Sequence, residues 1–449
     1  MSKPKIPKRV SHALLNSLGA GVVPRVGLEY ISVGRKKELG ILLSDLEYIR
    51  EGSSSFRFVI GRYGSGKSFL LQLFRNYAMD RNFVVADADL SSDRRLAGTE
   101  GQGLATYREL MGNMATKTHP NGGALPLVLE RWISNIQTQI VQETGLRPED
   151  ENFDQQIESK ILLTIKNIEG LVHGFDFATV IINYWRGHRS EDNSHQKDAA
   201  LRWLRGEFTS KMEAKSALNV RVIIDDSTWY DYLKILAKFA TDIGYQGLII
   251  ILDEAVHLWK INHPTSRQHN YDKLLAIFND TMQGKAEHLG IIIGATPKFL
   301  EDPKRGLFND PAWQRRTNKS QFVKPGMIDE ASPVIQVGSL TQPEILSLLD
   351  HLMEVYSNYH EQNNLLKKSQ LEEFMEALSN RLGSEILLTP GEIVRDFLAV
   401  LNILQKHPEL SLQQIINGHD SPIDIEKKRL RTDDDGLEMA EFILWNLPN

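Results

Sequence analysis

Residues 61–68 read GRYGSGKS, which matches the pattern G-x-x-x-x-G-K-[S/T] at every position. The run SFRFVIG that leads into it is apolar and short, as a buried strand is, and SFLLQLFRNYAMDR after it has helical spacing of its apolar residues. A glycine-rich turn between strand and helix points backbone N–H groups at one place, beside the positive end of the helix dipole. The motif therefore predicts a phosphate-binding loop. The alternative is an accidental glycine-rich turn.

Each residue type in this loop has a chemical use. The Lys67 ammonium can reach the β- and γ-phosphates of a nucleotide, and the Ser68 hydroxyl can complete the oxygen shell of Mg²⁺. We therefore expect ATP or ADP to bind here with Mg²⁺. The candidate cofactor-binding residues are Gly61, Arg62, Tyr63, Gly64, Ser65, Gly66, Lys67, Ser68 and Phe69.

Three further short apolar runs predict the other strands of a sheet. They read FVVADADL at 83–90, GLIIILDE at 247–254 and LGIIIGATP at 289–297. A fourth run, RVIIDD at 221–226, is expected to be one more strand. Segments with helical periodicity lie between these runs, and such alternation is typical of a parallel α/β sheet.

Two acids end the most apolar of these runs. A strand as apolar as GLIIILDE is buried on both faces, so Asp253 and Glu254 are expected at the rim of the sheet beside the phosphate loop. There Asp253 would hold Mg²⁺ and Glu254 would polarise the attacking water. The alternatives are an Asp that caps the following helix, or the pair Asp225 and Asp226 in the same role at the end of RVIIDD. The helix STWYDYL after that pair makes capping a sufficient explanation for them, with Asp226 or Ser227 as the N-cap.

Four more residues are candidates for catalysis. Thr296 ends the strand LGIIIGA, where its hydroxyl could orient the attacking water or cap the next turn. Arg315 and Arg316 follow a loop with two prolines, from which one of them could reach the γ-phosphate of a neighbouring subunit. Arg395 lies on a C-terminal helix and could close onto the γ-phosphate. The alternatives are a solvated basic pair for 315–316, and an ion pair with Glu392 or Asp396 for Arg395.

The pattern of elements predicts four parts. A basic N-terminal arm with a short helix covers residues 1–27. An ATPase core covers 28–340 and contains a long helical insertion at 94–225, broken at the charged segments RPEDENFD and HRSEDNSHQKD. A helical lid covers 341–417 and a tail covers 418–449.

Composition excludes several classes of protein. With 52 Lys and Arg against 58 Asp and Glu, the net charge of −6 argues against a protein that simply coats nucleic acid. The chain has no cysteine, which excludes disulfides, thiolate catalysis and Cys-based zinc sites. No apolar run approaches the roughly 20 residues that cross a bilayer, and the basic start lacks the apolar core of a secretory signal. We expect a cytoplasmic protein with no membrane contact.

Several motifs resemble known families. VGRKKEL, ahead of the loop, is similar to the Gly-Arg-x-x-Glu box of the origin-recognition and STAND branches of the AAA+ ATPases. GRYGSGKSF, FVVADADLSSDRRL, YREL, YQGLIIILDE, IIIGATPKFLEDPKRGLF and TPGEIVRDFL look like the ATP-binding proteins of BREX-type phage-defence operons, most of all the shorter of the two ATPases. The similarity extends from about residue 20 to residue 405.

The resemblance implies an AAA+ type P-loop NTPase with a parallel sheet and a C-terminal helical lid. It places Val33, Gly34 and Arg35 near the adenine, makes Thr296 the first sensor and Arg395 the second, and assigns hydrolysis to Asp253 and Glu254. The expected function is an ATPase of bacterial antiviral defence whose ATP state controls assembly or partner recruitment. Its expected partners are further copies of itself, other proteins of the operon, and DNA through those proteins. The alternatives are a nucleotide-held scaffold without hydrolysis, and a DNA-loading ATPase.

Overall fold

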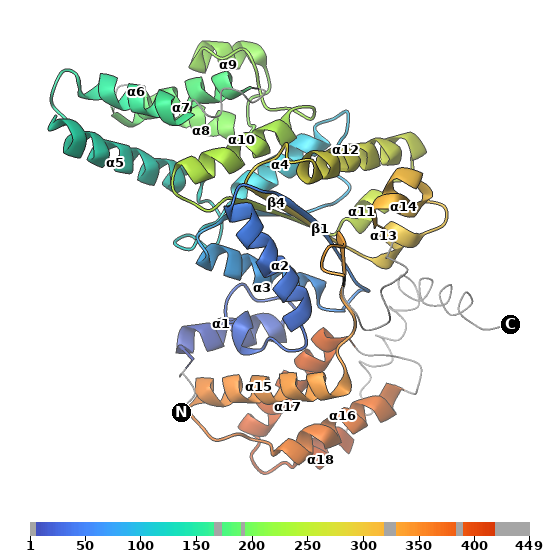
Figure 1. Ribbon diagram of the computed structural model, residues 1–449. Helices are drawn as coiled ribbons and strands as arrows, with labels where there is room; N and C mark the ends of the chain where they lie inside the picture. The colour runs from blue at the N-terminus through green and yellow to red at the C-terminus, as the bar shows by residue number, and fades with distance from the viewer. Residues whose placement is uncertain (1–5, 166–172, 190–193, 318–328, 383–388, 418–449) are drawn as a thin grey trace. The chain divides into compact units, whose positions relative to one another are not determined.

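The computed structural model describes residues 6–165, 173–189, 194–317, 329–382 and 389–417. They form two compact units: Val23–Thr341, which we call the core unit, and Met1–Val22 together with Gln342–Asn449, which we call the C-terminal unit. Figure 1 gives the element labels. Among the residues with described positions, every helix falls short of the length or the apolar character that a bilayer crossing requires.

A five-stranded parallel sheet is the centre of the core unit. Its strands are β1 (Ser55–Ile60), β2 (Val84–Asp89), β3 (Leu248–Asp253), β4 (Leu289–Ala295) and β5 (Val334–Gln336). The order across the sheet is β2-β3-β4-β1-β5, so β4 separates β1 from β3. Because all strands are parallel, their carboxyl ends lie along one edge. The predicted α/β fold is confirmed, and four of the strands fall within the runs that predict them. β5 was not predicted, because only Val334 and Ile335 of its three residues are apolar.

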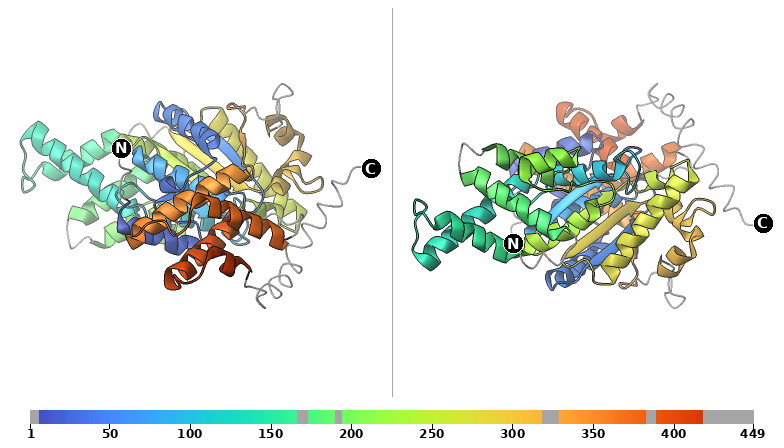
Figure 2. Two further views of the ribbon diagram at one scale, coloured as in Figure 1. Left: turned by 90° about the horizontal axis from the view of Figure 1, so that it is seen from below. Right: turned by 90° about the horizontal axis from the view of Figure 1, so that it is seen from above.

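Helices cover both faces of the sheet. On one face lie α2 (Lys36–Arg50) and α3 (Lys67–Asp80), whose leucines pack against Val59, Val85 and Ile249 of the strands. On the other lie α4 (Gln102–Gly112), α10 (Trp229–Asp242) and α12 (Pro264–Met282), against Phe56, Phe58 and other strand residues. Figure 2 shows the strands between these two layers. Alternate strand residues face opposite sides, so apolar residues on both faces bury the sheet completely.

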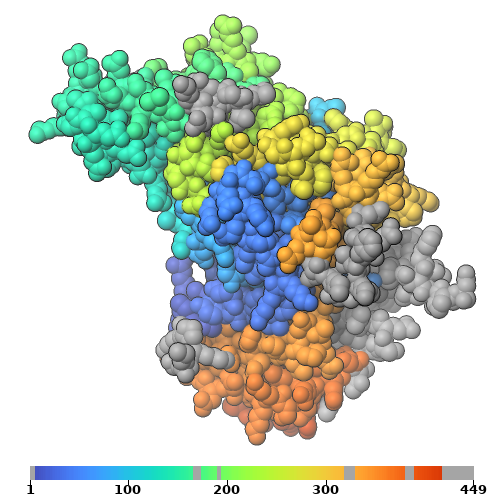
Figure 3. All heavy atoms as spheres, viewed as in Figure 1, coloured from blue at the N-terminus to red at the C-terminus, as the bar shows by residue number. Residues whose placement is uncertain are grey.

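The predicted insertion is helical. After α4 it contains α5 (Leu125–Thr144), α6 (Phe153–Ile165), α7 (Gly174–Arg189), α8 (Ser194–Leu204) and α9 (Lys211–Leu218). In the space-filling view, the teal surface of α5 and α6 protrudes from the core unit (Figure 3). The predicted break at 188–198 is wrong in the residues that the structure describes, because α7 extends to Arg189 and α8 already begins at Ser194. Residues 190–193 lie outside the described residues.

The expected strand at 221–226 is also wrong. This stretch forms no strand, although Ile224 is buried in the core. The Val222 carbonyl accepts a 2.9 Å hydrogen bond from Trp203 Nε1, a side-chain donor, in place of a neighbouring strand. The apolar run therefore anchors the end of the insertion to the core without joining the sheet.

The C-terminal unit is a set of packed helices. It contains α15 (Gln342–His360), α16 (Lys368–Leu382), α17 (Pro390–Lys406) and α18 (Leu412–Asn417). The N-terminal helix α1 (Lys8–Gly19) packs against α15 and α17, with His12 and Tyr359 in ring contact at 5.6 Å. The described N-terminal residues, 6–22, thus group with this unit, and the arm over 1–27 remains a prediction. The predicted tail at 418–449 lies outside the described residues.

Candidate nucleotide-binding site

The predicted phosphate loop connects β1 to α3. Two glycines in the left-handed region shape it, Gly64 with φ 73° and Gly66 with φ 87°. The Ser65 amide donates to the Arg62 carbonyl at 3.1 Å, which closes a tight turn, and α3 begins at Lys67. Backbone of this kind would be strained at residues with a Cβ. The loop therefore presents backbone N–H groups beside the start of a 14-residue helix, an arrangement suited to an anion.

Lys67 is the first residue of α3 and is buried. It is 9% exposed, and its Nζ donates to the Arg62 carbonyl at 3.3 Å. Burial lowers the pKa of Lys67, and the charges of Asp253 and Glu254 oppose this shift. The ammonium thus lies within the electrostatic influence of both acids predicted at the end of β3. Within the part of the chain that the structure describes, it donates to this one carbonyl, which leaves it donors for a phosphate.

Asp253 meets the phosphate loop directly. Its Oδ2 accepts a 2.7 Å hydrogen bond from Ser68 Oγ, and its Oδ1 accepts one from the Glu254 amide at 2.8 Å. Hydroxyl and carboxylate oxygens are ligands that Mg²⁺ prefers. The two predicted metal-binding residues, Ser68 and Asp253, are therefore adjacent, and their donor atoms fit that ion.

Glu254 follows Asp253 in an unusual backbone conformation. Its φ of 56° is left-handed, which is rare for a residue other than glycine or asparagine. The next amide, of Ala255, donates to the Gly294 carbonyl of β4 at 2.9 Å and holds the turn in place. Burial and then the charge of Asp253 raise the pKa of the Glu254 carboxyl, against the opposing charges of Lys67 and Lys260. A carboxylate with a raised pKa is a better proton acceptor at neutral pH.

Thr296 lies at the same edge of the sheet. β1 and β4 are paired so that Ile60 faces Ala295, and the Gly61 amide donates to the Ala295 carbonyl at 3.2 Å. Thr296 is the N-cap residue of α13 (Pro297–Glu301), but its side chain makes no capping bond. Its buried Oγ1 has no hydrogen-bond partner among the described residues. The capping explanation therefore does not hold, and an unpartnered hydroxyl lies next to the start of the phosphate loop.

The residues predicted near the adenine lie just before α2. Arg35 is 5% exposed, and its Nη2 donates to the Ser65 carbonyl at 2.6 Å and the Gly338 carbonyl at 2.8 Å. Val33 and Gly34 precede it and are half-buried, and Gly34 has φ 70°. The structure thus brings the Gly-Arg-x-x-Glu segment into direct contact with the phosphate loop. A role for Val33 and Gly34 toward adenine remains a prediction.

The outer residues of the loop differ in exposure. Tyr63 is 83% exposed, Arg62 and Ser68 are also exposed, and Phe69 is half-buried on the first turn of α3. The side chain at position 63 therefore points to solvent from the tip of the loop. Nucleotide contact at these positions, as at the others of the loop, remains a prediction.

The three arginines have different surroundings. Arg316, on α14 (Pro311–Thr317), donates to the Ala312 carbonyl at 2.8 Å and to Asn279 Oδ1 at 3.2 Å, so it braces α14 against α12. Arg315 is exposed. Arg395 belongs to the C-terminal unit, where its Nε lies 3.7 Å from Asp396 Oδ1. That is one of the ion pairs considered as its alternative, and its role as second sensor remains a prediction.

The rival pair of acids has a structural role. Asp226 Oδ2 accepts from the Gly101 amide at 2.8 Å, and Oδ1 from the Leu104 amide at 2.7 Å, so it caps the first turn of α4. Burial alone would raise the pKa of Asp225, but hydrogen bonds from Ser227 and Thr228 lower it. The expected N-caps Asp226 and Ser227 are wrong for α10, because Thr228 occupies that position.

Sequence reasoning missed Asp89. This residue ends β2 and pairs in register with Asp253 of β3, so both carboxylates lie on the same face at the same edge. Burial, followed by the charges of Asp253 and Glu254, raises the pKa of Asp89. The signal was present, because FVVADADL ends in an acid just as GLIIILDE does.

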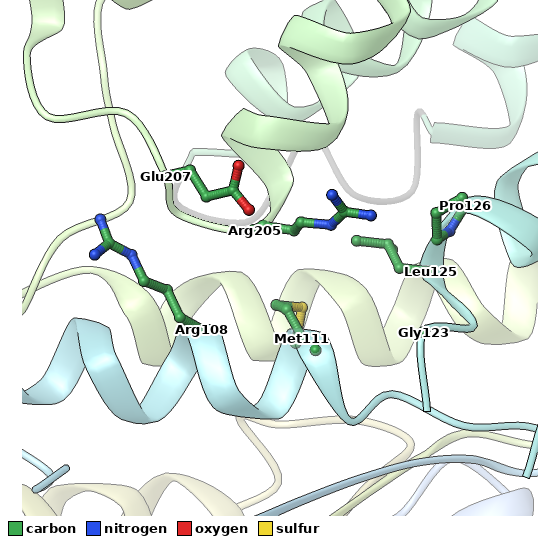
Figure 4. A pocket seen from close by; sticks show the side chains of 8 residues that line it. Arg108, Met111, Gly123, Leu125, Pro126, Arg205 and Glu207 are labelled. Atoms are coloured by element: carbon green, nitrogen blue, oxygen red, sulfur yellow. The ribbon is translucent and has the colours of Figure 1, made fainter. Parts of the chain in front are cut away.

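A separate cavity of about 330 Å³ lies between α4, the start of α5 and the loop after α8. Figure 4 shows Arg205 reaching across it toward Leu125, with Glu207 and Arg108 nearby. Arg108 Nε donates to the Gly206 carbonyl at 2.8 Å. None of the lining residues belongs to the phosphate loop or to the acids of β3. The cavity is thus distinct from the candidate site.

The parallel sheet, the loop between β1 and α3, and the acid at the end of β3 together define a P-loop NTPase fold. Residues 6–420 match the family described as BREX system ATP-binding protein BrxC/D, and the chain belongs to this family. No curated protein matches the chain. The family unites BrxC and BrxD, so the resemblance to the shorter ATPase remains a prediction. Membership confirms the expected ATP-binding role in a phage-defence system.

Proposed function

We propose that the chain is an AAA+ type ATPase that binds ATP with Mg²⁺ at residues 61–69 and hydrolyses it. The observation that supports this best is the 2.7 Å hydrogen bond between Ser68 Oγ and Asp253 Oδ2, with the Lys67 ammonium beside them. Ser68 and Asp253 would hold Mg²⁺, which when bound neutralises charge on the β- and γ-phosphates. Lys67 and the loop amides would bind the same phosphates from the other side.

Hydrolysis needs a base and an oriented water. In the proposed step, Glu254 accepts a proton from water as the water oxygen bonds to the γ-phosphorus. The bond from that phosphorus to the β–γ bridging oxygen breaks, which yields ADP and phosphate. Thr296 would orient the water or the γ-phosphate, and support for this role comes from its buried Oγ1, which has no hydrogen-bond partner among the described residues. A pure scaffold would use Mg²⁺ but would have no need of Glu254 in a strained left-handed conformation.

We further propose that ATP-bound copies assemble or recruit other proteins of the defence system, and that hydrolysis releases them. Of the two candidates on α14, Arg315 is favoured as the residue supplied to a neighbouring copy, because Arg316 is held by Asn279 and Ala312. DNA would be reached through partner proteins, in keeping with the net charge of −6.

The test is ATP turnover by the purified chain, alone and with duplex DNA, alongside its mass in solution with and without ATP. Turnover together with an ATP-dependent increase in mass is expected. ATP binding with no turnover under any condition would favour the scaffold. Turnover that requires DNA, with direct DNA binding by the chain alone, would favour the loading ATPase.

A further inference from the structure

The guanidinium of Arg35 joins two segments of the core unit that are far apart in sequence. A single nitrogen, Nη2, donates to the carbonyl of Ser65 in the phosphate loop and to that of Gly338 just after β5. Glu38 Oε1 lies 3.4 Å from Nη1, so the charge is paired as well as buried. The two bonds from Nη2 are 2.6 Å and 2.8 Å long, and charge-assisted hydrogen bonds this short are among the stronger ones in proteins.

The bond to Ser65 sets the direction of one amide in the phosphate loop. In a trans peptide the C=O and the following N–H point in opposite directions. When Arg35 holds the Ser65 carbonyl on the outside of the loop, the N–H of Gly66 is turned to the inside, where a phosphate would lie. Gly66 also has φ 87°, and a Cβ there would lie 3.7 Å from Arg35 Nη2. The guanidinium therefore supports the loop conformation from behind.

The bond to Gly338 reaches the chain where it leaves the sheet. Here the phosphate loop and the exit of β5 also touch directly. The Val337 amide donates to the Ile60 carbonyl at 2.7 Å, and a Cβ on Gly61 would lie 2.7 Å from the Val337 carbonyl oxygen. Three residues after Gly338 the core unit ends at Thr341, and the chain continues into α15. The phosphate loop and Arg35 thus contact residues 337 and 338, which lead toward α15.

We propose that Arg35 is a positioning residue that keeps the Gly66 amide turned toward the nucleotide phosphates and couples the phosphate loop to the segment Val337–Thr341. The inference rests on the proposed function, since it requires ATP at this loop. It assigns Arg35 a task that needs no contact with the nucleotide. Occupation of the loop by phosphate would restrict the motion of residues 337–341, and loss of the guanidinium would uncouple the two.

The chain offers a matched control in Arg57 of β1. Its Nη1 donates to two carbonyls that precede β5, those of Glu330 at 2.8 Å and Ser332 at 2.6 Å, and Asp45 pairs its charge. Arg57 therefore holds the start of β5 as Arg35 holds its end. Of these two arginines, Arg35 is the one that contacts the phosphate loop. Replacing either arginine is expected to loosen β5, whereas replacing Arg35 is also expected to weaken nucleotide binding.

The experiment combines calorimetry of ATP with Mg²⁺ and hydrogen exchange of the peptide that contains residues 337–341. In the wild type, ATP is expected to slow exchange in that peptide. Arg35→Ala and the charge-conserving Arg35→Lys should bind ATP about tenfold more weakly, the scale of one lost charge-assisted bond. At saturating ATP they should show no slowing in 337–341. Arg57→Ala should keep wild-type affinity and the wild-type response.

Three outcomes would count against the proposal, and they are separable. If the wild type binds ATP but exchange at 337–341 does not respond, the coupling is absent, and this measurement needs no variant. If Arg57→Ala reproduces the loss seen in Arg35→Ala, the effect is loosening of β5 and not positioning of the loop. If the wild type binds no ATP at all, the proposed function fails and this inference fails with it.

Discussion

Ser68 Oγ donates a 2.7 Å hydrogen bond to Asp253 Oδ2 across 185 positions of the chain. Strand β4 lies between β1 and β3 and contains neither residue. It nevertheless leaves room for the contact, because a Cβ at Gly294 would overlap with Asp253 Oδ1. The proposed Mg²⁺ ligands are thus brought together across three neighbouring strands, and the middle strand leaves room for Asp253 because residue 294 has no side chain.

Gly294→Ala tests this arrangement without removing a functional group. The new methyl should displace the Asp253 carboxylate, and we expect Mg²⁺-dependent ATP affinity to fall at least about tenfold. Gly290→Ala, on the same strand, is the control. A Cβ there meets only the Cδ1 atoms of Ile49 and Ile249, which are the movable ends of side chains. Equal ATP affinities in both variants, measured by calorimetry with and without Mg²⁺, would argue against Asp253 as a ligand.

Lys67→Ala removes the ammonium that faces the proposed phosphates. Nucleotide affinity should fall at least tenfold, about 1.4 kcal/mol. Because burial already opposes the charge of Lys67, its loss should leave the thermal unfolding temperature close to that of the wild type. Unchanged ATP affinity in calorimetry, with a folded variant, would mean that the loop does not bind phosphate.

Glu254→Gln separates binding from turnover. The amide keeps the shape of the side chain but cannot accept a proton, so ATP should stay bound while turnover falls by roughly 10² or more. Phosphate release and ATP affinity are measured on the same preparation. A parallel loss of both would assign Glu254 to binding.

The pH dependence of turnover gives a second view of Glu254. Only the ionised carboxylate can accept a proton, and burial together with Asp253 raises its pKa above the ordinary value of a glutamate. Turnover should therefore decline as the pH falls toward that raised pKa, at a higher pH than an exposed glutamate would show. An acid limb that is unchanged in Glu254→Gln would assign it to another group.

Asp226→Ala distinguishes a structural acid from a catalytic one. Removing the cap of α4 should cost about 1–2 kcal/mol of unfolding free energy, while ATP affinity and turnover per folded molecule stay at the wild-type level. Urea unfolding and ATPase assays measure the two quantities. A loss of turnover without a loss of stability would return this residue to the list of catalytic candidates.

Some sequence patterns in this chain predict local structure by themselves, and others depend on tertiary contacts. The phosphate loop and the acids of β3 are local signals, since each needs only a strand and the residues after it. The apolar run at 222–224 resembles the runs that form strands, yet it forms no strand. Strand formation also requires a neighbouring strand with free backbone groups, and this is a tertiary property that a local pattern does not contain.

Contacts between residues distant in sequence could not be predicted for the same reason. Nothing in VGRKKEL indicates that Arg35 reaches Ser65 and Gly338, and nothing in the N-terminal segment indicates that α1 packs with α15 and α17. Asp226 shows the converse. Its position after an apolar run is what a metal ligand would have, and only the amides of Gly101 and Leu104 reveal the cap.

Arg315 provides the test of assembly. If this exposed arginine completes the site of a neighbouring copy, specific ATPase activity must rise with protein concentration. Arg315→Ala should then lower turnover by about 10³-fold or more, the scale of an arginine supplied in trans, and leave ATP binding nearly intact. Arg316→Ala is the control. It removes the bonds to Asn279 and Ala312, so its main effect should be on the unfolding free energy.

Mixing two inactive variants makes the test decisive. Arg315→Ala has an intact phosphate loop, and Lys67→Ala has an intact arginine, so a mixed assembly contains some sites in which both are present. Because only those sites are complete, the mixture should recover a fraction of wild-type turnover, and that fraction should depend on the ratio of the two variants. Recovery would be impossible if each copy supplied its own arginine. Activity that is independent of concentration, from a protein that remains a monomer with ATP, would make Arg315 a surface charge.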